Sequence, residues 1–139
     1  MSLKKAKQLL LMGQYTCVLV KDSDVLTSTN RCVRTLVDWL NSDFSVRGYS
    51  AADKVVGRAT AFLYVLLGIS ELYAAVVSQP ALDVLKLHGI SVEYGKCVDN
   101  IINRAGDGIC PFESAVMNIT DPDHAHTAII EKMRSMGII

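Results

Sequence analysis

The sequence predicts a single α/β domain over residues 1–139, with helices covering both faces of a mixed β-sheet. Two short β-branched segments near the N-terminus flank a polar turn, which is typical of an antiparallel hairpin. A strand, a helix and a strand follow one another over residues 71–94, and such a crossover makes its two strands parallel. A chain of 139 residues is long enough to bury one sizeable core.

The N-terminal third predicts a helix, the hairpin and a second helix. Residues 3–12 carry apolar side chains at helical spacing, so they predict an amphipathic helix. Segments 15–20 and 25–29 are rich in β-branched residues and form the two strands of the hairpin. Helical spacing returns over residues 33–40, and a polar loop over 42–49 follows.

The longest helix is predicted over residues 50–68. Ser50 and Asp53 suit a capped helix start, and Gly68 suits a helix end. Residues 59–69 include no charged residue, so we expect this helix to pass through the core. Its charged start would then lie where the core meets the surface, which is a suitable place for a functional site.

The second half continues the α/β pattern. Residues 71–77 predict a buried strand, and Pro80 suits the first turn of the helix that follows. Residues 90–94 predict a second, parallel strand. A polar loop over 103–113 then leads into a short helix, and a final helix is predicted over 121–136.

Charge and cysteine usage narrow the classes of function. Fourteen acidic residues balance fourteen basic ones, which disfavours a nucleic-acid partner. The four cysteines stand singly, as is typical of free thiols in the cytoplasm. The N-terminus lacks a cleavage site, and the apolar run is shorter than the roughly 20 residues that cross a bilayer. We therefore expect a cytoplasmic protein without a membrane partner.

Four motifs spread along the chain carry a resemblance to a known family. They are Ala-Asp-Lys-Val-Val-Gly-Arg-Ala from Ala52, Ser78-x-Pro80-Ala81, His88-Gly89-Ile90, and Asn103-Arg104-x-x-x-Gly108-x-Cys110-Pro111-x-Glu113. The order of the elements and these motifs, over residues 14–121, resemble a bacterial family of unknown function with a fold similar to that of the cytidine deaminases. The resemblance implies a cytidine-deaminase-like three-layer α-β-α sandwich, and it brings no established activity.

The residues at the two relevant helix starts disfavour zinc-dependent deamination. Zinc deaminases need a His or Cys followed by a Glu at one helix start, and Pro-Cys-x-x-Cys at the other. Here the first start carries Asp53 and Lys54, and the second carries Pro80 with Ala81 and Val84 in the thiolate positions. Alanine and valine cannot bind a metal, and a catalytic zinc needs three protein ligands. We expect neither a zinc site nor another cofactor.

The convergence of two helix N-termini at the carboxyl ends of parallel strands is the first candidate site. Without zinc, the resulting concavity suits an anion such as a phosphate or a carboxylate. Asp53, Lys54 and Ser78 are the ligand-binding candidates there, and Arg58 could add charge to the rim. Asp53 is itself an anion at the predicted helix start, so capping alone is an alternative interpretation.

The polar loop is the second candidate. Asn103, Arg104 and Asp107 could wrap a ligand, and arginine suits bidentate contact with phosphate or carboxylate. Cys110 precedes a short helix, where the dipole lowers a thiol pKa, although it could equally be a small buried hydrophobe. Glu113 completes the set of ligand-binding candidates.

Three hypotheses about function remain open. The first is a module that binds a nucleotide-like or other phosphorylated small molecule. The second is a metal-independent enzyme that uses Asp53, Cys110 or both as catalytic groups. The third is an oligomerisation scaffold, and assembly into a homo-oligomer is expected from the deaminase-like resemblance.

Overall fold

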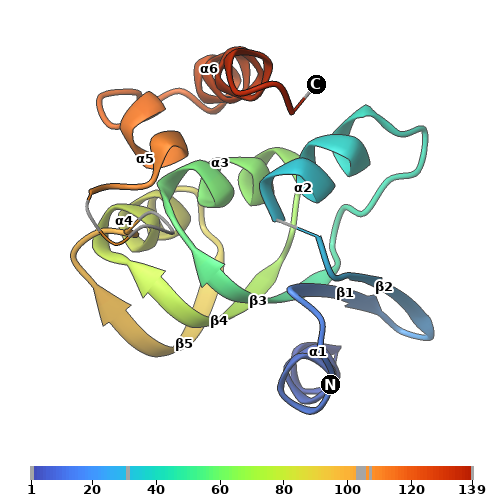
Figure 1. Cartoon of the computed structure of the whole chain (residues 1–139). Coiled ribbons are helices and arrows are strands. Elements are labelled where there is room, and N and C mark those ends of the chain that lie inside the picture. Colours follow the sequence, from blue (N-terminus) through green and yellow to red (C-terminus); the bar gives the residue numbers. More distant parts are fainter. Residues whose placement is uncertain (1, 31, 103–105, 107, 139) are drawn as a thin grey trace.

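The computed structural model describes residues 2–30, 32–102, 106 and 108–138 and shows a mixed five-stranded sheet with helices on both faces (Figure 1). The elements in chain order are α1 (Ser2–Met12), β1 (Cys17–Lys21), β2 (Asp24–Ser28), α2 (Cys32–Asn41), β3 (Ser50–Val56), α3 (Arg58–Leu67), β4 (Glu71–Ser78), α4 (Gln79–Leu87), β5 (Ser91–Val98), α5 (Pro111–Ala115) and α6 (Pro122–Ser135). The predicted α/β class is therefore confirmed.

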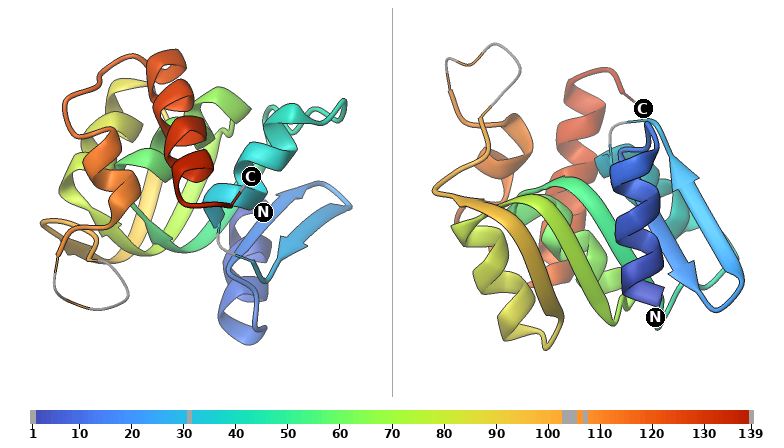
Figure 2. Two further views of the ribbon diagram at one scale, coloured as in Figure 1. Left: turned by 45° about the horizontal axis from the view of Figure 1, so that its top comes forward. Right: turned by 90° about the horizontal axis from the view of Figure 1, so that it is seen from below.

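The strand order in the sheet is β2-β1-β3-β4-β5. β1 pairs antiparallel with both β2 and β3, whereas β3, β4 and β5 are mutually parallel. The predicted hairpin and the predicted parallel crossover are both confirmed. α1 crosses the face formed by β1 and β3 and leaves β5 uncovered, while the other helices lie on the opposite face (Figures 1 and 2).

The predicted long helix over residues 50–68 is wrong in its first part. Ser50–Val56 forms the central strand β3, and the helix begins only at Arg58. Ala51 and Ala52 point to opposite faces of the sheet and are both fully buried. A strand that is buried on both faces lacks the alternation of polar and apolar residues that identifies a strand in a sequence.

The predicted helix cap at Ser50 is wrong for the same reason. The Ser50 hydroxyl donates a hydrogen bond of 2.7 Å to the Glu71 carboxylate of the neighbouring strand β4. That acceptor comes from a residue far along the chain, so local sequence patterns carry no sign of it. A serine at this place in the sequence suits a helix cap as well as a strand, because both use the same hydroxyl.

The pairing of the three parallel strands is interrupted at one level. Residues on either side are paired in register, but Lys54, Ala75 and Gly95 have no partner in the ladder. The Val55 amide donates to the Asp53 carboxylate at 3.1 Å, and a Cβ on Gly95 would lie 2.9 Å from the Ala75 carbonyl oxygen. The register is the same on both sides of this level, so none of the three strands carries an inserted residue.

Two apolar cores stabilise the layers. The larger lies between the sheet and the helices of the opposite face, and it includes Phe62, Leu63 and Tyr64 of α3, each at most 1 % exposed. The smaller lies under α1 and includes Ala6 and Leu10. The prediction of an apolar helix through the core is confirmed for α3. Within the described residues, none of the helices has both the length and the apolar character needed to span a membrane.

Candidate functional site

The starts of α3 and α4 lie side by side at one edge of the sheet. β3 leads into Gly57, the N-cap of α3, and β4 ends at Ser78, the N-cap of α4. Because β3 and β4 are adjacent and parallel, with Val56 opposite Val77, both helices begin at the same level. Each start presents main-chain N–H groups at the positive end of a helix dipole. The predicted convergence is present, but its α3 arm begins at Gly57 and not at Ser50.

The carboxylate of Glu113 joins the two helix starts. Its Oε2 accepts a hydrogen bond of 3.1 Å from the Ala59 amide of α3, and its Oε1 accepts one of 3.3 Å from the Ser78 hydroxyl. The Ser78 hydroxyl in turn accepts from the Ala81 amide at 3.2 Å. Glu113 is only 6 % exposed. The concavity predicted to suit an anion therefore holds an acidic group of the chain itself.

Gly57 allows this approach because it has no side chain. A Cβ at this position would lie 2.6 Å from the Glu113 carboxyl carbon and 2.8 Å from each carboxyl oxygen. The backbone of Gly57 has φ −97° and ψ 178°, which any residue can adopt, so space and not backbone conformation requires glycine here. Sequence reasoning missed this residue, although a glycine two residues before the long uncharged segment 59–69 is a visible signal.

Burial raises the pKa of the Glu113 carboxyl above its ordinary value of 4.5. The hydrogen bonds from the Ala59 and Arg58 amides and the Ser78 hydroxyl, and the charge of Arg58, act in the opposite direction and lower the pKa. Burial is the largest of these effects, because removing a carboxylate from water disfavours its charged form. The helix starts thus partly offset the loss of solvation of this group.

Arg58, the first residue of α3, holds the segment that follows Glu113. Its guanidinium donates hydrogen bonds to the main-chain oxygens of Val116 and Ile119, the first at 3.2 Å. The same guanidinium lies 5.1 Å from the centre of the Phe62 ring. Glu113 and Arg58 therefore fasten α5 and the segment that follows it to the start of α3.

Asp53 and Lys54 lie before this helix start, in β3. Asp53 is 1 % exposed and accepts a hydrogen bond of 2.7 Å from the Tyr64 hydroxyl on α3. Its carboxylate thus lies beneath α3 and does not cap the helix. Lys54 is exposed, and its amide donates to the Thr16 carbonyl. Of the predicted ligand-binding residues, the structure brings Ser78 and Glu113 into direct contact.

The predicted binding loop is described only in part. Asn103, Arg104 and Asp107 lie outside the described residues. Cys110 is half-buried and occupies the N-cap position of α5, a helix of five residues, where its side chain makes no capping hydrogen bond. Among the described residues, no group of three or more His, Cys, Asp or Glu side chains is arranged to hold a metal ion.

Comparison with one solved structure supports this fold. The crystal structure of the DUF1893 family protein TM1506 from Thermotoga maritima has a TM-score of 0.85 and 22% identity, over 94% of this chain and 89% of that chain. The dCMP deaminase of cyanophage S-TIM5 is similar at a TM-score of 0.45 in its apo form, with 18% identity over 67% of this chain and 93% of that chain. Its complex with dCMP and dUMP has a TM-score of 0.46 and 16% identity, over 66% and 92%.

Curated protein sequences gave no match. The profile of a family described as a domain of unknown function, DUF1893, matches residues 5–133. This match spans nearly the whole chain, and the chain therefore belongs to the DUF1893 family.

Proposed function

We propose that the chain is a module that binds a nucleotide-like or other phosphorylated small molecule at the starts of α3 and α4. One observation carries this proposal: the Glu113 carboxylate lies between the two helix N-termini and accepts hydrogen bonds from Ala59 and Ser78. Phosphate groups bind at helix N-termini through the same main-chain donors and the same dipole. The internal carboxylate thus takes the position that we assign to the anionic group of the ligand.

The charge of the neighbouring arginine favours the binding of an external anion at this site. The Arg58 guanidinium donates to neutral carbonyl oxygens, and no carboxylate in the described part of the chain lies within ion-pair distance of it. A phosphate that displaced Glu113 would meet two helix N-termini and a cation suited to phosphate oxygens.

Thermal unfolding with added anions tests the proposal. Nucleoside monophosphates, sugar phosphates and inorganic phosphate are added to the wild type, to Glu113→Ala and to the control Glu131→Ala, which removes an exposed acidic residue of α6. We expect at least one nucleotide or sugar phosphate to stabilise the wild type, by about 2.7 kcal/mol at 100 times its dissociation constant. We expect inorganic phosphate to stabilise Glu113→Ala most, because that substitution vacates the helix starts.

Two outcomes together would refute the proposal. In the first, no nucleotide or sugar phosphate shifts the unfolding temperature of the wild type. In the second, phosphate stabilises Glu113→Ala no more than Glu131→Ala. The oligomerisation scaffold would then be the better hypothesis, because it predicts that Glu113 and Arg58 affect stability alone.

The enzyme alternative receives less support from the described residues. Asp53 is buried beneath Tyr64, and Cys110 begins a helix too short to develop a strong dipole. We further propose that the protein acts in the cytoplasm as a homo-oligomer, without a nucleic-acid or membrane partner. The equal numbers of acidic and basic residues support the absence of a nucleic-acid partner.

A further inference from the structure

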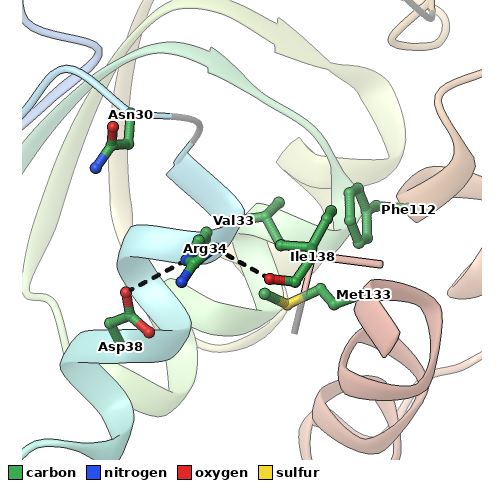
Figure 3. A pocket seen from close by; sticks show the side chains of 7 residues that line it. All are labelled: Asn30, Val33, Arg34, Asp38, Phe112, Met133 and Ile138. Atoms are coloured by element: carbon green, nitrogen blue, oxygen red, sulfur yellow. Dashed lines mark hydrogen bonds and ion pairs between the residues drawn. The ribbon is translucent and has the colours of Figure 1, made fainter. Parts of the chain in front are cut away.

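A cavity of about 480 Å³ lies between α2, α5 and the end of α6 (Figure 3). Its volume falls in the range of roughly 300–1,000 Å³ that is typical of small-molecule sites. Asn30, Arg34 and Asp38 supply its polar lining, and the latter two belong to α2. It does not include Glu113, Ala59 or the other residues of the site at the helix starts.

The end of the cavity away from Asn30 is apolar, and hydrogen bonds hold its wall in position. Val33, Phe112, Met133 and Ile138 gather there, whereas Asn30 lies at the far end (Figure 3). The wall at Ile138 is held by two hydrogen bonds: its amide donates to the Met133 carbonyl at 2.9 Å, and its carbonyl accepts from Arg34 at 3.0 Å. The cavity therefore has a definite polarity, with a charged middle and an apolar end.

The two charged residues in the lining retain hydrogen-bonding capacity. Arg34 Nε and Asp38 Oδ2 are 3.9 Å apart, which is too far for a hydrogen bond. A guanidinium has five N–H donors, and both side chains are more than half exposed. Their charges sum to zero, so a phosphate dianion attracted by Arg34 would be repelled by Asp38. A ligand that carries one negative and one positive group fits this pair better.

We propose that this cavity is a second ligand site, which takes a zwitterionic amino acid with a large apolar side chain. Its carboxylate would contact the Arg34 guanidinium, and its ammonium group would contact the Asp38 carboxylate. Its side chain would lie against Val33 and Phe112 at the apolar end, where the burial of apolar surface favours binding. This site is independent of the phosphate site proposed above.

Isothermal titration calorimetry on the full chain tests this inference with L-phenylalanine and L-leucine. Two matched probes complete the set: 3-phenylpropionate lacks the ammonium group, and phenethylamine lacks the carboxylate. We expect both amino acids to bind, and each truncated probe to bind at least tenfold more weakly than phenylalanine. Arg34→Gln and Asp38→Asn should each weaken phenylalanine binding at least tenfold.

A matched control separates this site from the rest of the molecule. Lys86→Gln, a change of an exposed residue on α4, should leave phenylalanine binding unchanged. The inference would be overturned if neither amino acid bound, or if the truncated probes bound as tightly as phenylalanine. Undiminished binding by both Arg34→Gln and Asp38→Asn would also overturn it. Asp38→Asn tests the charge without removing the hydrogen bond from Arg34 that holds Ile138.

Discussion

Adding a methyl group at Gly57 should push the Glu113 carboxylate away from the helix starts. The new Cβ would lie 2.6 Å from the carboxyl carbon, whereas ordinary contact begins at 3.4 Å, so the carboxylate must retreat by about 0.8 Å. That shift would break or greatly lengthen its hydrogen bonds of 3.1 and 3.3 Å to Ala59 and Ser78. Hydrogen bonds to a charged group contribute about 1.5–3 kcal/mol, and overpacking costs about 1–3 kcal/mol. We expect Gly57→Ala to lower the free energy of unfolding by about 2–3 kcal/mol.

The same substitution should lose its effect when Glu113 is shortened. In a Glu113→Ala background the clash is gone, and the backbone of Gly57 suits alanine. Alanine leaves the unfolded chain less conformational freedom than glycine, and this stabilises the folded protein by about 0.4–1 kcal/mol. That gain offsets the poorer N-cap preference of alanine. We expect Gly57→Ala to change the stability of Glu113→Ala by less than about 0.5 kcal/mol, so the two substitutions are coupled by about 2 kcal/mol.

Urea unfolding of the four proteins measures this coupling, with circular dichroism and Trp39 fluorescence as two probes. Equal slopes of stability against urea concentration would show that the unfolding transitions are comparable. Glu113→Asp, shorter by one methylene, serves as a second background. If Gly57→Ala destabilises the wild type and both backgrounds equally, the contact between Gly57 and Glu113 does not determine stability and the reasoning is wrong.

Three further predictions concern pH, the buried Asp53 and the cysteines. Because the pKa of Glu113 is raised on folding, the folded protein binds more protons than the unfolded chain between pH 4.5 and the higher folded pKa. Stability should therefore fall as pH rises through this interval, and Glu113→Gln should abolish that part of the pH dependence in urea titrations. Tyr64→Phe should cost about 1.5–3 kcal/mol, because it removes a hydrogen bond to the buried Asp53 carboxylate. In timed alkylation followed by mass spectrometry, the exposed Cys97 should react faster than the half-buried Cys110.

Controls and contrary outcomes differ among these predictions. Glu131→Gln, on the exposed side of α6, should keep the pH dependence of the wild type; the same dependence in Glu113→Gln would contradict the assignment to Glu113. Tyr94→Phe, an exposed tyrosine of β5, should change stability little, and an equal effect of the two tyrosine substitutions would count against the Asp53 contact. Faster alkylation of Cys110 than of Cys97 would indicate that the Cys110 thiol is activated and would support the enzyme hypothesis.

Much of the fold follows from local patterns in the sequence. The hairpin has alternating β-branched residues around a polar turn, and the helix after Ser78 has the expected proline in its first turn. The crossover from β4 to β5 was predicted from its order and length alone. These features depend on residues that are close together in the sequence, so local sequence patterns predict them.

The central strand β3 was not predicted, because the strands that stabilise it are distant in the sequence. The segment from Ser50 to Val56 is flanked by β1 and β4, and it contains two alanines and a polar start that also suit a helix. Tertiary pairing overrides the local preference in such a segment. Misplacing the helix start shifted the candidate site to Asp53, four residues before the true N-cap at Gly57.

The sequence by itself determined the α/β class, the hairpin, the parallel crossover and the expectation that two helix starts converge. Only the tertiary structure decided what occupies the convergence. The Glu113 carboxylate comes from a segment 35 residues beyond Ser78 and 54 beyond Ala59, and it reaches both because Gly57 leaves room. No local pattern encodes that contact, since it exists only when the sheet edge and α5 are packed together.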